Sequence, residues 1–384
     1  MLLIFLLFVM LKPHIFKIDT ERSSIFQVVL QPAQNALFSN QLDDLSYQYD
    51  NLLITLNLNE NDLFFSKVFI SDYLNQKEII RKHPLFESKF SNCGLSVVEQ
   101  PPLDGSKINI LLLFVKGAAI QKKREGNLFY AKTNNHLHIF QGVECHAPAT
   151  MLEKGTEDLF EQHQKLMNQF AMNMTDNCAR TWLYVKDVDK DYEAVVRGRN
   201  TFFDRIGLTK ETHFIASTGI GGSGESVEIP LYAEFYSVKD LRPEQIRYLT
   251  AKDYLNSTHE YGVAFERGVN ISYADISCTF ISGTASIDRH GDCLFQGDIV
   301  KQLERIFINI EQLLKDADAV MTDIGHLIVY LRDISDYHAV NSYLTANYGA
   351  IPYIITHAKV CRTQWLVEIE CMALKKNKLN LPGN

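Results

Sequence analysis

The chain has 384 residues, of which 46% are hydrophobic and 22% are charged, and its formal net charge is −8. This balance is typical of a soluble globular protein with two or three compact domains, and it argues against a disordered or fibrous chain. Because the chain is acidic and has no basic run, most of its surface would repel a phosphate backbone, which argues against nucleic acid as a partner.

An uninterrupted apolar run from Met1 to Leu11 opens the chain. Such a run suggests a signal peptide, but it is too short to span a bilayer, no basic residue precedes it, and no small-residue cleavage pattern follows. We favour a buried strand, or a start codon assigned too early, over secretion, and we expect no membrane partner.

Three short runs rich in β-branched and aromatic residues recur along the chain, and each is closed by an acid. They are LFFSKVFISD, RTWLYVKD and GHLIVYLRD, ending at Asp72, Asp187 and Asp333. Such runs are typical of strands, and a helical stretch follows each of them. Since each aspartate stands where a strand passes into a helix, we interpret the three as caps of free N–H groups.

The segments around these strands also match one another. Apolar residues at spacings of three and four precede each strand, at 42–52, 159–170 and 299–314, which is typical of amphipathic helices. After the short helix, each copy has an extended segment, a polar turn and a second apolar strand. The glycine-rich turn of the second copy, 216–224, matches no phosphate-binding pattern, so we interpret it as a turn between two strands.

This triple recurrence predicts an α/β (α+β) fold with three tandem units, each a sheet with two helices stacked on one face. We place a degenerate first unit at residues 1–116, a second unit at 117–238 and a third at 256–384. Residues 239–255 are predicted to form a helical connector.

The third copy resembles the RidA/YjgF superfamily along nearly its whole length, from FISGTASIDRHGDCLFQGD through VYLRDISDYHAVNSYL to VEIECMAL. That family is known for small α/β subunits that assemble as trimers, with ligand pockets in the clefts between neighbours. The resemblance implies that the three fused copies form a pseudo-trimer, with chemistry between copies that requires no cofactor or metal.

Within the superfamily, the chain resembles the chorismatase branch, which hydrolyses the enolpyruvyl ether of chorismate and releases pyruvate. The resemblance lies in the SGTAS stretch, in the Gly198–Arg199 step, and in Cys361 and Arg362 followed by Glu368. It implies that Glu368 transfers the proton and Arg199 anchors a carboxylate, with Cys361 influencing the choice of product. The other residues that it places near the substrate are Arg362, Ser282, Gly283 and Thr284.

Glu368 stands in the apolar segment WLVEIECMAL. A carboxylate in a buried strand is costly unless it is paired, hydrogen-bonded or protonated, and burial raises its pKa, which suits a general acid or base. Glu370 shares its face by period-two alternation, and a glutamate salt-bridged at an interface is the alternative interpretation. We expect the equivalent residues to be Glu228, which marks a second candidate cleft, and Asn109, which cannot transfer protons.

Two arginines are candidate anion ligands. Arg199 lies on a predicted helix, where its planar fork suits a carboxylate, although a solvated surface arginine is the alternative. A tyrosine that the chorismatase branch has one turn earlier is replaced by Val195. Arg332 closes the YLRD strand and either binds an anion or pairs with neighbours of Asp333.

Two further functions stay open. An imine or enamine deaminase of this superfamily carries an arginine on the strand before the last, where this chain has Ile355. A non-catalytic protein that binds small metabolites is the other, since a fold does not fix a function. In each case the partner is a small carboxylate, and self-association remains open. The seven scattered cysteines lack metal-ligand spacing, so we expect reduced thiols in a cytoplasmic protein.

Overall fold

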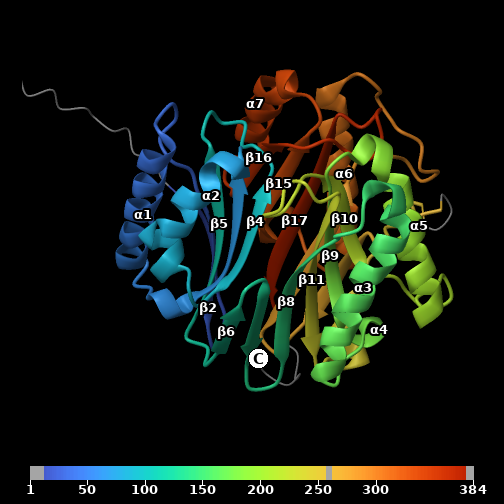
Figure 1. Ribbon diagram of the computed structural model, residues 1–384, viewed down its shortest axis with the longest axis horizontal. Helices are drawn as coiled ribbons and strands as arrows, with labels where there is room; N and C mark the ends of the chain where they lie inside the picture. The colour runs from blue at the N-terminus through green and yellow to red at the C-terminus, as the bar shows by residue number, and fades with distance from the viewer. Residues whose placement is uncertain (1–12, 257–261, 378–384) are drawn as a thin grey trace, which may run out of the picture.

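The computed structural model describes residues 13–256 and 262–377, so the apolar run Met1–Leu11 lies outside the described residues. The chain forms three mixed β-sheets, and helices cover the outer face of each (Figure 1). The prediction of three tandem sheet-plus-two-helix units is therefore confirmed.

The first unit has the strand order β1-β2-β5-β3-β4. Its elements are β1 (His14–Asp19), β2 (Ser24–Leu30), α1 (Phe38–Thr55), β3 (Leu63–Ile70), α2 (Tyr73–Lys82), β4 (Gly94–Glu99) and β5 (Ile108–Lys116). The sheet is complete, although the repeat is weakest here in sequence.

The second unit has the strand order β10-β9-β11-β8-β7-β6. Its elements are β6 (Gln121–Glu125), β7 (Leu128–Lys132), β8 (Leu137–Glu144), α3 (Leu152–Gln169), α4 (Met174–Asn177), β9 (Cys178–Val185), α5 (Val188–Ile206), β10 (Ala216–Gly221) and β11 (Leu231–Lys239).

The third unit has the strand order β12-β13-β14-β17-β15-β16. Its elements are β12 (Ile246–Tyr248), β13 (Gly268–Ser272), β14 (Ile276–Thr284), α6 (Ile299–Asp316), β15 (Ile324–Leu331), α7 (Tyr337–Tyr348), β16 (Tyr353–His357) and β17 (Val367–Lys376).

The same four-strand core recurs in all three sheets, as β2-β5-β3-β4, β8-β11-β9-β10 and β14-β17-β15-β16. In each core the last two strands are parallel, and a helix connects them. The long helix of each unit buries its apolar stripe, such as Leu303, Ile306 and Ile310 of α6. The apolar residues whose spacing predicted the repeat are therefore residues of the hydrophobic core.

The predicted aspartate caps are present in two of the three units. Asp72 accepts a hydrogen bond from the backbone N–H of Asn75, and Asp333 accepts one from that of Ser335. Asp187 makes no side-chain cap, because its carboxylate binds Lys190 at 2.6 Å instead.

The predicted helical connector is wrong. A 3₁₀ turn at Pro243–Gln245 leads into β12, which pairs with the edge strand β13. Ile246 and Tyr248 are half-buried on either side of the exposed Arg247, which is the alternation of a strand. Pairing with an open sheet edge has overridden the local helical preference.

Each unit contacts both of the others through isolated backbone bridges. Glu99 of the first unit pairs with Ser223 of the second, and Ile220 of the second pairs with Val360 of the third. Pro102 of the first pairs with Thr356 of the third. Among the described residues, no helix is long and apolar enough to cross a membrane.

Candidate functional site

A cavity of about 470 Å³, hereafter the cleft, lies between the second and third units. The second unit contributes residues of α5 and β10, and the third contributes the loop before β17 and the start of that strand. Five residues that the sequence analysis singled out line it together, namely Arg199, Gly283, Cys361, Arg362 and Glu368.

Glu368 is 4% exposed and lies on β17, opposite Tyr330 of β15. Burial, together with the nearby charge of Glu370, raises the pKa of the Glu368 carboxyl to about 8, although Arg180 and Arg267 act in the opposite direction. Glu368 therefore holds a proton at neutral pH and can act as a general acid.

Glu370, two residues along the same strand, has a different environment. Its carboxylate forms an ion pair with Arg180 at 2.8 Å and accepts hydrogen bonds from Trp182 Nε1 at 3.0 Å and Thr218 Oγ1 at 2.6 Å. Glu370 is thus the salt-bridged interface glutamate, and the two acids of the pair have separate roles.

Gly283 makes room for the Glu368 side chain. A Cβ atom at this position would overlap Glu368 Oε1 and would crowd Thr218. The glycine of the SGTAS stretch is therefore needed because a carboxylate approaches the backbone closely.

We expect Gly283→Ala to displace the Glu368 carboxylate. A misplacement of about 1 Å at a reacting group lowers turnover by about 10²-fold. Steady-state kinetics with chorismate, the substrate that the resemblance implies, measures the effect, and the thermal unfolding midpoint serves as the folding control. Unchanged turnover would show that the position of Glu368 is not critical.

Besides the exposed Arg197, which pairs with Glu153 and Glu193, three arginines line the cleft. Arg199 of α5 is 1% exposed and lies over the ring of Phe203, so the alternative of a solvated surface arginine is wrong. Gly198, the residue before Arg199, allows α5 to pack directly on the backbone of Glu153. Arg362 stacks on Trp365 with 4.9 Å between its guanidinium carbon and the ring centroid.

The third of these arginines, Arg267, was missed by the sequence analysis. It is 5% exposed and donates to the backbone oxygen of Asn256 at 3.3 Å and to its Oδ1 at 3.1 Å. Tyr192 of α5 was missed as well. It lies two turns before Arg199 and lines the cleft, whereas Val195 is buried in the core of the second unit.

Three predicted substrate-binding residues have structural roles instead. Ser282 Oγ accepts hydrogen bonds from Arg180 at 3.1 Å and from the Ser217 N–H at 3.0 Å, and Thr284 Oγ1 donates to the Ser282 carbonyl. Arg332 donates to the Val360 carbonyl at 2.6 Å and pairs with Asp189 at 2.5 Å. Ser282 and Arg332 thus join the second and third units, whereas the Thr284 bond lies within the third unit. None of the three residues is among those that line the cleft.

The prediction that Glu228 is equivalent to Glu368 is wrong. Glu228 is exposed in the loop before β11. In the sheet register, Tyr232 lies opposite Tyr184 as Glu368 lies opposite Tyr330. The counterpart of Glu370 is Glu234. Pro230 lacks the N–H that a central strand needs, so β11 begins after it and the VEI sequences do not align.

At the other two interfaces, the residues in corresponding positions have bonding partners within the protein. Between the first and second units, Glu234 forms a buried ion pair with Lys67 at 2.9 Å and also bonds Ser96. In the first unit, Asn109 lies at the position of Glu368, as predicted, and bonds Asp104 and Ser106. The carboxyl whose pKa is raised to about 8 is therefore the one in the cleft.

The Cys361 thiol lies beside Glu368. Burial and the negative charge of Glu368 raise the pKa of this thiol, so it stays protonated and is a poor nucleophile.

Across the parts of the chain that the structure describes, no group of three His, Cys, Asp or Glu residues could hold a metal ion.

The chain matches known proteins both in sequence and in fold. Residues 272–375 match the family model described as Endoribonuclease L-PSP. RutC family proteins of Pyrococcus abyssi and Pyrococcus horikoshii are each 29% identical over 99 residues, which are 25% of this chain and 78% and 79% of those proteins. A crystal structure of chorismatase matches with a TM-score of 0.64 at 17% identity, over 93% of this chain and 99% of that one.

Proposed function

Because this chain is a tandem-repeat protein of the RidA/YjgF superfamily, we propose that it hydrolyses the enolpyruvyl ether of chorismate, or of a closely similar carboxylate, in the cleft. One observation carries the proposal, which is a buried carboxyl with a pKa of about 8 in a cavity whose wall includes Arg199, Arg267 and Arg362. The chorismatase-like fold, which extends over 93% of the chain, supports it.

The reaction needs one proton and one water molecule. Glu368 donates its proton to the methylene carbon of the enolpyruvyl group, and the electrons of the C=C bond form the new C–H bond. The resulting oxocarbenium carbon is attacked by water, which returns a proton to the Glu368 carboxylate. The hemiketal then collapses to pyruvate and the ring alcohol. Every step uses groups of this chain, the substrate and water.

The arginines suit the charges of such a substrate. Arg199 and Arg267 are buried, and a planar guanidinium binds a carboxylate through two parallel N–H donors. A dianionic substrate would place one carboxylate in this part of the cleft and leave the other for Arg362. Binding the carboxylates fixes the methylene carbon relative to Glu368, which lowers the entropic part of the barrier.

We expect turnover to fall as the pH rises above about 8. The pKa of Glu368 is raised from its ordinary value of 4.5 to about 8, so its acid form is present below this pH and is lost above it. A logarithmic plot of kcat against pH should be flat near pH 7 and decline by about tenfold per unit on the alkaline side. A decline only below pH 5 would indicate that Glu368 acts as a carboxylate.

We expect Arg199→Lys to raise KM with a smaller effect on kcat, because an ammonium point charge replaces a bidentate fork. Loss of one charge-assisted hydrogen bond corresponds to about 10-fold to 100-fold in KM. Arg205→Lys is the matched control, since Arg205 lies on the same helix and pairs with Glu161 at the surface. An unchanged KM in Arg199→Lys would remove this residue from substrate binding.

An assay of two products distinguishes the candidate functions. The purified chain is incubated with chorismate and, separately, with an imino acid, while pyruvate and ammonia are measured. Pyruvate from chorismate without ammonia supports the proposal. Ammonia from the imino acid would favour deamination, and ligand binding without either product would favour a metabolite-binding protein.

A further inference from the structure

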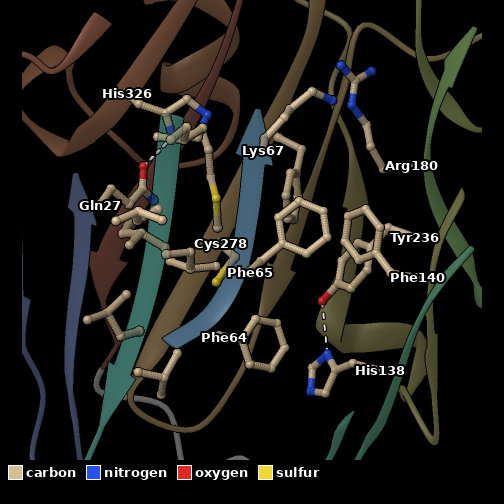
Figure 2. A pocket seen from close by; sticks show the side chains of 18 of the residues that line it. Gln27, Phe64, Phe65, Lys67, His138, Phe140, Arg180, Tyr236, Cys278 and His326 are labelled. Atoms are coloured by element: carbon tan, nitrogen blue, oxygen red, sulfur yellow. Dashed lines mark hydrogen bonds between the residues drawn. The ribbon is translucent and has the colours of Figure 1, made fainter. Parts of the chain in front are cut away.

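A second cavity, of about 180 Å³, lies at the centre of the molecule and is hereafter the central cavity (Figure 2). The inner faces of all three sheets line it, and it shares no lining residue with the cleft. Apolar side chains predominate in its wall, and the aromatic ones among them include Phe64, Phe65, Phe140 and Tyr236.

The charges at the wall of the central cavity are compensated. Lys67 pairs with Glu234, and Arg180 pairs with Glu370. Burial lowers the pKa of His138 to about 3 and that of His326 to about 4, so both imidazoles are neutral at pH 7. An anion or a cation would have to be desolvated here without a free counter-charge, which is costly.

Two lining side chains, Gln27 and Tyr273, have a buried polar atom without a hydrogen-bond partner among the described residues. Gln27 is 1% exposed, and its Oε1 bonds His326 Nδ1, as Figure 2 shows. Among the described residues, no hydrogen-bond partner meets Gln27 Nε2. A Cβ atom at position 325 would overlap the Gln27 amide, so Gly325 is what admits this side chain. A buried N–H without an acceptor costs free energy that a ligand can recover.

We propose that the central cavity binds a small neutral aromatic molecule that carries one hydrogen-bond acceptor. Its ring would lie among the aromatic side chains, and its acceptor would meet Gln27 Nε2. The size fits, because an apolar protein cavity of about 150 Å³ stays dry and binds benzene. The half-buried residues Ser23, Ala118 and Ile120 line the cavity beside the β1–β2 and β5–β6 turns, which gives a route of entry.

Calorimetric titration with acetophenone and ethylbenzene tests this proposal. Acetophenone has a carbonyl acceptor, and ethylbenzene has a similar shape without one. The full-length protein should bind acetophenone saturably with one-to-one stoichiometry, and about threefold to tenfold more tightly than ethylbenzene. Gln27→Leu should remove this preference while leaving ethylbenzene binding in place.

Filling the central cavity provides the control for location. Cys278 lines it, and Cys278→Phe should abolish binding of both compounds; Leu113→Phe is the second filling variant, in case the first does not fold. Thermal unfolding shows which variants are native. Acetophenone that fails to bind the wild type, or that binds a natively folded filling variant with wild-type affinity, overturns the proposal. Equal preference in wild type and Gln27→Leu overturns the role of Gln27.

Discussion

Replacement of Glu368 by glutamine is expected to lower turnover of an enolpyruvyl substrate by about 10²–10⁴-fold, with little change in KM. Glutamine keeps the shape and the hydrogen-bonding capacity of the side chain but has no acidic proton. The expectation follows from the burial of Glu368 in the cleft and from its raised pKa. Steady-state kinetics at pH 7 measures it directly.

Two controls accompany this variant. Glu228→Gln changes an exposed glutamate of the same unit that contributes Arg199, and it should retain full activity. The second control is stability. Because the folded pKa of Glu368 is raised above 4.5, its proton stabilises the fold at low pH, and this contribution is lost as the pH rises through about 8. Glu368→Gln should therefore be at least as stable as the wild type at pH 9. Full activity in Glu368→Gln would remove this residue from the chemistry.

Lys67→Met is expected to destabilise the protein by about 3–5 kcal/mol, because it leaves Glu234 buried without its counter-ion. Lys67 of the first unit and Glu234 of the second are 5% and 2% exposed, and their charged atoms are 2.9 Å apart. Urea unfolding followed by circular dichroism measures the loss. The stability should recover in large part in the double variant Lys67→Met/Glu234→Gln, since neither buried charge then remains.

A surface pair supplies the comparison for this effect. Lys154 and Asp158 are exposed on α3, and loss of such a pair costs at most about 1 kcal/mol. Lys154→Met should therefore leave the unfolding midpoint nearly unchanged. An equally small loss of stability in Lys67→Met would show that the buried pair does not stabilise the contact between the first two units.

The fold was predictable from the sequence because each unit carries its own periodicity. The stripe of Leu303, Ile306 and Ile310 and the three strands that are each followed by an aspartate report local structure, which a single repeat determines. The connector was not predictable in this way. The strand β12 exists because β13 offers an open edge, and that edge depends on residues more than 20 positions away.

The site residues were predictable only where a single segment of the sequence contained the signal. A glutamate within WLVEIECMAL is conspicuous because an apolar strand disfavours it, and Glu368 is indeed buried in the cleft. Register was not predictable, since alternation alone does not reveal which residue of β11 faces Tyr184. Arg180 looks like an ordinary surface arginine in the sequence, because its buried partners Ser282 and Glu370 belong to the third unit. Arg267 gives no signal either, because its bonds to Asn256 depend on tertiary structure.

Hydrolysis of chorismate in H₂¹⁸O, followed by mass spectrometry of both products, tests the proposed function most directly. Protonation by Glu368 and attack of water on the oxocarbenium carbon break the bond between the ether oxygen and the pyruvyl carbon. The ring product should therefore retain the unlabelled ether oxygen, and pyruvate should appear in equal amount. Labelled oxygen on the ring, or no pyruvate at all from the natively folded protein, would contradict the account.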